Sequence, residues 1–136
     1  MKIFITGVAG FLGSHLADLM ISQGHSVAGN DNMIGGYTDN VPQDVEFHQI
    51  DCCDLENLTK AMAGCDIVYH TAATAYEGLS VFSPVLVTRN IFEASVTTIT
   101  AAIRNKVKRI VYCSSMARYG HHDDVPYKES YQCKPQ

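Results

Sequence analysis

Three glycines spaced three residues apart directly follow a short apolar segment at the start of this chain, and few folds accept that arrangement. The apolar segment covers residues 3–6, and the glycines are Gly7, Gly10 and Gly13. Glycine tolerates a positive φ angle and has no Cβ, so a ligand can approach the main chain closely. A helix that begins directly after such a turn offers unpaired N–H groups and a positive dipole end to an anion. The segment therefore predicts a strand, a phosphate-binding turn and a helix.

The helix after the glycines is expected to begin at about Leu12 and to end near Gly24, because glycine is common just past the end of a helix. Its predicted apolar face consists of Leu12, Leu16, Leu19 and Met20. Two other interpretations of the segment are a glycine turn without a ligand and a signal peptide. A signal peptide requires an uninterrupted apolar stretch, whereas His15 and Asp18 occupy polar helix positions here. The choice between a dinucleotide site and a bare turn depends on the neighbouring segments.

An acidic residue ends the second predicted strand at a spacing typical of dinucleotide-binding proteins. This strand covers residues 26–31, and Asp31 lies 18 residues after Gly13. A carboxylate at this place would accept hydrogen bonds from the hydroxyls of a ribose, and the alternative is an ordinary turn Asp before Asn32. Residues 3–59 contain no Lys or Arg. Because a 2′-phosphate requires a nearby cation, the site is expected to prefer NAD over NADP.

Strand-like and helix-like segments alternate along the rest of the chain. Further strands are predicted at residues 45–50, 66–70 and 109–113, and further helices at residues 54–63 and 84–105. Such alternation is typical of parallel strands joined by right-handed crossovers. We therefore predict an α/β fold: a Rossmann-type, doubly wound parallel sheet of about five strands that forms one domain over residues 1–136. Ligands of such sheets bind at the carboxyl ends of the strands.

Charge and composition exclude several classes of partner. Residues 1–59 contain one basic and eight acidic side chains, which argues against a nucleic-acid partner. The basic run at residues 104–109 is interpreted as a solvated helix end. No apolar run approaches the ~18 residues needed to span a membrane. Five cysteines without pairing or metal-ligand spacing predict free thiols in the cytoplasm and no metal site.

Suitable residues follow the predicted strands. Asp51 could accept an adenine amino proton while the Cys52 main chain meets the ring, and Asp54 is interpreted as a helix cap. The small residues at 71–75 would let the nicotinamide ribose and the pyrophosphate pass close to the backbone. His70, on an apolar strand, is expected to be a hydrogen-bonded core residue.

Taken in order, these segments resemble a known family. They are Thr6-Gly7-x-x-Gly10-Phe11-x-Gly13, Asp31-Asn32, Asp51-x-x-Asp54, His70-x-Ala72-Ala73 and Ser114-Ser115-x-x-x-Tyr119-Gly120. Together they closely resemble the extended short-chain dehydrogenase/reductases, specifically the NAD-dependent nucleotide-sugar epimerases and dehydratases. The resemblance covers the whole chain. It implies NAD as the cofactor and a nucleoside-diphosphate sugar as the partner of the complete enzyme.

The resemblance also implies roles for single residues. The pyrophosphate, adenosine and nicotinamide contacts would come from Gly7, Gly10, Phe11, Leu12, Gly13, Asp31, Asn32, Asp51, Cys52, Ala72 and Ala73. Ser115 matches the catalytic hydroxyl that hydrogen-bonds the sugar oxygen destined to become a carbonyl. Tyr76 and Glu77 match the loop near the sugar.

Two features depart from the family pattern. Asn90 precedes Ala94 by four residues, where the family has Asn three residues before a Gly-Thr pair. The family's general base is a Tyr with a Lys four residues later that lowers its pKa, and no Tyr in this sequence has Lys at that offset. The sequence therefore resembles the amino-terminal half of a larger enzyme, without the later strands and the sugar-nucleotide lobe. The alternatives are a non-catalytic dinucleotide-binding module, a truncated gene product, or an interaction protein that has lost the ligand.

An incomplete sheet would have two physical consequences. The fifth strand would become an exposed edge that is able to pair with another chain. The helix at residues 84–105 would lose a neighbour, so we expect self-association through its apolar positions Ile91, Val96, Ile99 and Ile103.

Overall fold

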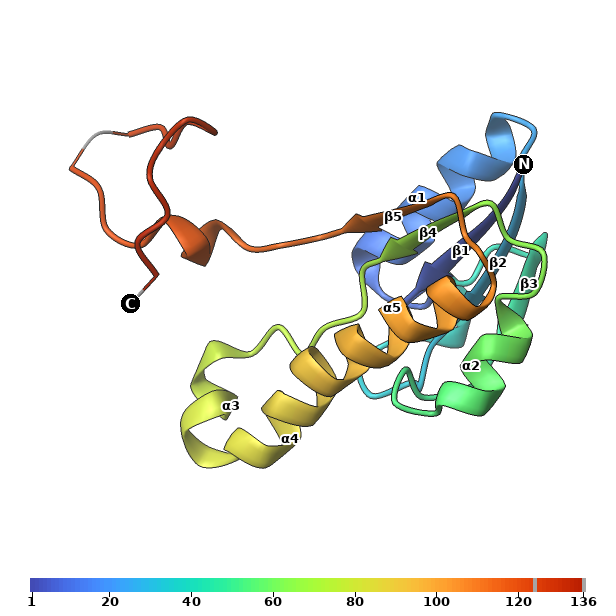
Figure 1. The fold of residues 1–136 in the computed structure, drawn as a ribbon, viewed down its shortest axis with the longest axis horizontal. Coiled ribbons are helices and arrows are strands. Elements are labelled where there is room, and N and C mark those ends of the chain that lie inside the picture. Colours follow the sequence, from blue (N-terminus) through green and yellow to red (C-terminus); the bar gives the residue numbers. More distant parts are fainter. Residues whose placement is uncertain (124, 136) are drawn as a thin grey trace.

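The computed structural model describes residues 1–123 and 125–135, and its centre is a five-stranded parallel sheet (Figure 1). The strands are β1 (Lys2–Thr6), β2 (Ser26–Asn30), β3 (Val45–His48), β4 (Ile67–His70) and β5 (Arg109–Tyr112). Their order in the sheet is β3-β2-β1-β4-β5, with all neighbours parallel. This order confirms the predicted doubly wound fold, because the chain returns to the middle of the sheet after β3 and continues on the other side of β1.

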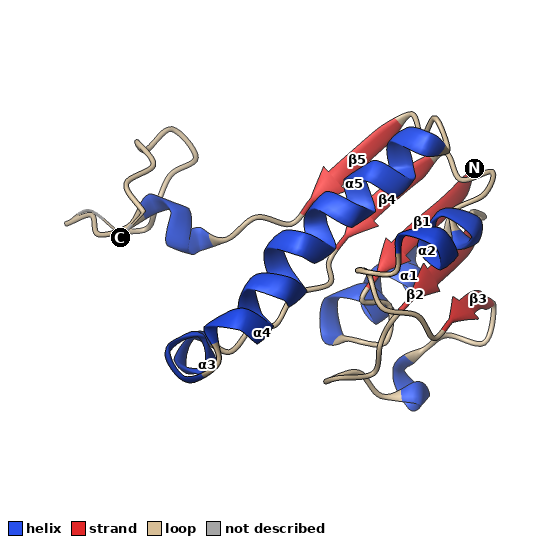
Figure 2. Ribbon diagram, turned by 60° about the horizontal axis from the view of Figure 1, so that its bottom comes forward, coloured by secondary structure: helices blue, strands red, loops and turns tan. Residues whose placement is uncertain are grey.

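Helices connect the strands and cover both faces of the sheet. They are α1 (Phe11–Ser22), α2 (Leu55–Ala61), α3 (Glu77–Phe82), α4 (Pro84–Thr88) and α5 (Ala94–Arg104), with the shorter turns η1 (Thr38–Asn40), η2 (Arg89–Glu93) and η3 (Met116–Tyr119). The helices α2 and α5 lie side by side on one face, and α1 lies on the other (Figure 2). The predicted helix at residues 84–105 is present as α4, η2 and α5 in direct succession, and η2 is a π-helical turn within it.

The hydrophobic core has two parts, one on each face of the sheet. Phe4 of β1 and Val68 of β4 are fully buried against α2 and α5. Ile3 and Ile5 point to the opposite face, where α1 covers them. Burial on both faces explains why β1 is a continuous apolar segment rather than an alternating one.

The predicted apolar face of α1 is correct for Leu16 and Met20, which pack against the core, but not for its other two members. Leu12 and Leu19 are 52% and 50% exposed, and the small residues Gly13, Ser14 and Ala17 face the sheet instead. The reason is the close approach of α1 to the glycine turn: a Cβ on Gly13 would lie 2.8 Å from the Gly7 carbonyl carbon. Only small side chains therefore fit where α1 approaches this turn.

The two edges of the sheet are β3 and β5. Every β5 residue is at least partly exposed, so the predicted exposed edge is confirmed within the described residues. The segment after β5, which includes η3, extends away from the sheet (Figure 1). None of the described helices is both long and apolar enough to cross a membrane.

Candidate functional site

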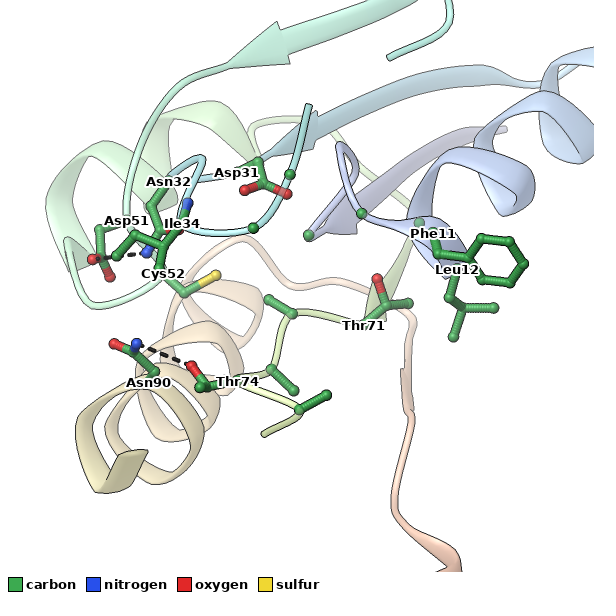
Figure 3. Close-up of a pocket in the computed structure, with 18 of the residues that line it drawn as sticks. Phe11, Leu12, Asp31, Asn32, Ile34, Asp51, Cys52, Thr71, Thr74 and Asn90 are labelled. Atoms are coloured by element: carbon green, nitrogen blue, oxygen red, sulfur yellow. Dashed lines mark hydrogen bonds between the residues drawn. The ribbon is translucent and has the colours of Figure 1, made fainter. Parts of the chain in front are cut away.

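The carboxyl ends of the strands open onto a pocket of about 330 Å³ (Figure 3). Its wall comes from the turns after β1, β2, β3 and β4 and from the helical segment formed by α3, α4 and η2. This is the edge at which open parallel sheets bind ligands.

The turn between β1 and α1 forms one end of the pocket from main chain alone. Gly7 has a φ of +71°, and a Cβ there would lie 2.8 Å from Cα of Ala72, so only glycine fits between the two loops. Gly10 is the N-cap of α1 and provides no side-chain hydrogen bond. The first main-chain N–H donors of a helix have no partner within it, and those of Phe11 and Leu12 are at this end of α1. The turn therefore combines free N–H donors with a positive helix end, which favours a bound anion.

A buried chain of hydrogen bonds holds this turn to α5. The N–H of Ala72 donates to Thr6 Oγ1, which lies 2.7 Å from His70 Nδ1. On the other side, His70 Nε2 lies 3.0 Å from Ser95 Oγ, and that hydroxyl donates to the carbonyl of Ile91 at 2.5 Å. Because the hydroxyl proton of Ser95 is already used, the network assigns the imidazole proton to Nε2 and leaves Nδ1 to accept from Thr6. Burial lowers the pKa of His70 to about 4.

His70 is thus a hydrogen-bonded core residue, as its position on an apolar strand predicts. Its side chain is 3% exposed, and both ring nitrogens have partners. His70 fastens the end of β4 to β1 on one side and to α5 on the other.

Asp31 organises the loop that follows β2. Its Oδ2 accepts the Ala9 N–H at 3.1 Å, and its Oδ1 accepts the Met33 N–H at 2.8 Å. The second contact is the side-chain turn that the ordinary-turn interpretation predicts. A carboxylate has about four acceptor positions, so Asp31 can still accept hydrogen bonds from a ligand in the pocket that it lines.

Asp51 holds together three separate parts of the pocket wall. Its Oδ1 accepts the Cys53 N–H at 2.8 Å, and its Oδ2 accepts from Asn32 Nδ2 at 3.3 Å and from Arg89 Nη1 at 3.1 Å (Figure 3 shows the Asn32 bond). Burial alone would raise the pKa of this carboxyl, but the hydrogen bonds from Cys53, Asn32 and Arg89 outweigh it and lower the pKa. Asp51 therefore stays ionised at neutral pH.

The structure brings most of the predicted site residues together. The pocket is lined by all eleven predicted cofactor-binding residues, Gly7, Gly10, Phe11, Leu12, Gly13, Asp31, Asn32, Asp51, Cys52, Ala72 and Ala73, and also by Tyr76. Ser115 does not line it: this residue caps η3 by accepting the Ala117 N–H at 3.1 Å. Glu77 begins α3, and its side chain lies outside the described residues. The roles of all these residues remain predictions.

Two asparagines that were not predicted to be site residues, Asn30 and Asn90, also line the pocket. Asn90 donates from Nδ2 to Thr74 Oγ1 at 3.0 Å, and both side chains line the pocket (Figure 3). Asn30 lines it as well and is fully buried, and its Oδ1 has no hydrogen-bond partner among the described residues. The available signal for Asn30 was a polar side chain at the end of an otherwise apolar strand, and the signal for Asn90 was its partial match to the family's Asn.

Comparison with known proteins gives a consistent result. The sequence model of the NAD dependent epimerase/dehydratase family matches residues 3–136. A probable UDP-arabinose 4-epimerase 3 of Arabidopsis thaliana is 31% identical over 138 residues, which cover 93% of this chain and 34% of that protein.

Two solved UDP-glucose 4-epimerases have the same fold over nearly the whole chain. The Thermotoga maritima enzyme, solved with UDP-glucose, has a TM-score of 0.92 at 28% identity and covers 100% of this chain and 45% of its own. The Thermus thermophilus enzyme, a complex with NAD, has a TM-score of 0.92 at 31% identity and covers 99% of this chain and 45% of its own. The chain therefore spans less than half the length of the proteins that it matches.

Proposed function

This chain belongs to the NAD dependent epimerase/dehydratase family, and from that premise we propose that it is the NAD-binding region of a UDP-sugar 4-epimerase. The observation that carries the proposal is the layout of the pocket. A side-chain-free anion site at the start of α1 forms one end, and two carboxylates, Asp31 and Asp51, stand on the wall after β2 and β3. A dinucleotide requires this combination, because it joins a diphosphate to ribose hydroxyls and an adenine amino group.

The residues of the chain fit NAD as the resident cofactor. The N–H groups of Phe11 and Leu12 would bind the diphosphate, and Asp31 would accept hydrogen bonds from the adenosine ribose. When it is bound, the cofactor would supply an acceptor that takes a hydride from a sugar carbon and can return it. Arg89 is the cation that the fold brings to this wall, but it pairs with Asp51 and does not line the pocket. The expected preference for NAD over NADP therefore still rests on Asp31.

The sugar chemistry is proposed for the longer protein rather than for these 136 residues. The solved relatives with NAD or UDP-glucose are more than twice as long as this chain, and no Tyr in its sequence has a Lys four residues later. In the longer protein Ser115 would hydrogen-bond the sugar oxygen during its transient oxidation, and the residues around Tyr76 would contact the sugar. By themselves, residues 1–136 are proposed to bind the dinucleotide. The proposal includes a cytosolic location, which the five free cysteines support.

Calorimetric titration of the chain with NAD⁺ is expected to show measurable binding, and Asp31→Ala is expected to weaken it about 100-fold. Charge-assisted hydrogen bonds contribute about 1.5–3 kcal/mol each, and this substitution removes the acceptor of the ribose hydroxyls. Asp31→Asn keeps one neutral acceptor and should weaken binding about 10-fold. NADP⁺ should bind far more weakly than NAD⁺ to the unsubstituted chain.

The matched control is Asp39→Ala, which removes an exposed carboxylate from η1, outside the pocket. Circular dichroism should show that all three variants are folded. Equal NAD⁺ affinity of the Asp31→Ala variant and the unsubstituted chain would refute the proposed ribose contact.

An exposed apolar stripe on η2 and α5 supports a second part of the proposal, self-association. Its residues are Phe92, Val96, Ile99 and Ile103, which are 69%, 49%, 39% and 70% exposed. Their spacing of four, three and four residues places them on one side of the helix, as at a helix–helix contact. Of the four positions predicted from the sequence, Ile91 is only partly exposed, and Phe92 takes its place.

Multi-angle light scattering at increasing concentrations is expected to show a dimer of the chain. Ile99→Glu should shift it to a monomer, because a buried unpaired carboxylate is costly at such a contact. Arg104→Glu, which places a carboxylate on the same helix outside the stripe, should leave the dimer intact. A monomer at every concentration tested would contradict this part of the proposal.

A further inference from the structure

The loop after β2 is fastened to the glycine turn through one residue of that turn, Ala9. The Ala9 carbonyl accepts the Tyr37 N–H at 3.2 Å, and it also accepts from Nδ2 of the Asn40 side chain at 3.0 Å. The N–H of the same residue donates to Asp31 Oδ2 at 3.1 Å. Ala9 is fully buried, and its main-chain groups therefore join three parts of the site: the turn, the carboxylate and the loop.

The loop also packs its main chain directly against the carboxylate of Asp31. A Cβ on Gly36 would lie 3.1 Å from both carboxylate oxygens and 2.8 Å from the Ala9 Cβ, so the loop has closed as far as a glycine allows. Oδ1 accepts the Met33 N–H at 2.8 Å, in addition to the bond from Ala9 to Oδ2. Asp31 therefore cannot turn away from its present position without breaking these contacts or moving the loop.

The fixed position of Asp31 matters most for a ligand with a phosphate on its adenosine ribose. In dinucleotide-binding sites an acidic residue at this place contacts the ribose 2′-hydroxyl. A 2′-phosphate would bring its negative charge against the carboxylate, and residues 3–59 contain no Lys or Arg to balance it. Moving Asp31 aside would relieve this repulsion, but the closed loop opposes that movement.

We propose that Asn40 is a positioning residue that increases the selectivity of this site for NAD over NADP, because it fastens the loop that immobilises Asp31. This inference rests on the proposed binding of NAD. Asn40 is exposed and does not line the pocket, so it acts through the loop rather than by contact with a ligand. Releasing the loop would leave Asp31 less well oriented toward the ribose hydroxyls, which weakens NAD binding. It would also free Asp31 to turn away from a 2′-phosphate, which favours NADP.

The test compares the affinities for NAD⁺ and NADP⁺ by calorimetry. The unsubstituted chain should prefer NAD⁺. Asn40→Ala, which removes the side-chain donor to the Ala9 carbonyl, should reduce the ratio of the two affinities about fivefold, the scale of one hydrogen bond between neutral groups. Asn40→Gln can still donate to this carbonyl and should restore most of the ratio.

Gly36→Ala tests the same loop by a different route. Its Cβ would meet the Ala9 side chain and both oxygens of Asp31, so it should push the loop away while Asn40 is still present. This variant should also reduce the ratio of the two affinities, and an unchanged ratio would count against the inference.

The matched control is Thr38→Ala, which shortens another exposed, uncharged side chain of η1 outside the pocket. It should leave the ratio unchanged. If the Asn40→Ala variant keeps the full ratio, or loses affinity for both dinucleotides equally, the inference is wrong and the proposed function stands. If the unsubstituted chain binds neither dinucleotide, the proposed function itself fails, and the inference fails with it.

Discussion

Substituting Gly13 by Ala is expected to lower the free energy of unfolding by about 3 kcal/mol, the upper end of the usual cost of overpacking, and to abolish dinucleotide binding. A Cβ at this position would lie 2.8 Å from the Gly7 carbonyl carbon and 2.9 Å from Val8 Cα. Both atoms belong to the main chain of the turn, so no side-chain rotation can relieve the clash. Either α1 or the turn must move, and that movement would separate the free N–H donors from the anion that they bind.

Urea unfolding followed by circular dichroism, together with NAD⁺ titration, would measure both effects. Gly78→Ala is the matched control, because a Cβ there meets no atom within 4 Å and the residue lies in helix α3. Alanine in a helix is more stable than glycine by about 0.5–1 kcal/mol, so this variant should be slightly stabilised. Unchanged stability and binding in the Gly13→Ala variant would show that α1 is not held against the turn as the structure has it.

Acidification from above pH 6.5 to about pH 4 is expected to lower the free energy of unfolding by about 3 kcal/mol, through the protonation of His70 alone. The folded pKa of His70 is about 4, below its ordinary value of 6.5, because burial destabilises the charged form of the ring. The neutral ring therefore stabilises the fold fully above pH 6.5. As the pH falls from 6.5 to about 4, the unfolded chain binds a proton that the folded chain does not, and stability declines. Below about pH 4 the folded state is protonated too, and this loss stops.

The measurement is a series of urea unfolding curves between pH 7 and pH 4. His70→Gln, which offers a donor and an acceptor but does not titrate, should lose this contribution to the slope. The carboxylates with lowered pKa values, such as Asp51, contribute mainly at lower pH, because the unfolded Asp pKa is about 3.9. A slope shared by the His70→Gln variant and the unsubstituted chain would contradict the assignment.

Features that depend on local sequence could be predicted well. The strand and turn around Gly7 follow from a few adjacent residues, and so does the Asp54 cap, whose Oδ1 accepts the Asn57 N–H at 3.1 Å. The apolar face of α1 was predicted only in part. Leu16 and Met20 pack against the core, but periodicity also selects Leu12 and Leu19, whereas the close approach at Gly13 admits only small side chains. Periodicity also assumes a uniform helix and so gives no sign of the π-turn η2.

Contacts between distant parts of the chain account for what the sequence could not reveal. The pairing of Arg89 with Asp51 joins a helix and a loop, and neither residue carries a local signal for the other. The count of basic residues between positions 3 and 59 correctly finds no cation there, but it cannot anticipate one supplied by the fold from position 89. In the same way, the sequence around His70 does not indicate that its ring has hydrogen-bond partners on both β1 and α5.

The central place of β1 also has a consequence for the order of events during synthesis. β1 can pair with β2 as soon as residues 26–30 have left the ribosome, but its other neighbour, β4, ends 64 positions after Thr6. Until then the glycine turn has no opposite wall, because Ala72 has not yet been made. Distant pairings form late, since the intervening chain must first be ordered. The nucleotide pocket therefore cannot be complete until residues through Ala72 have been synthesised.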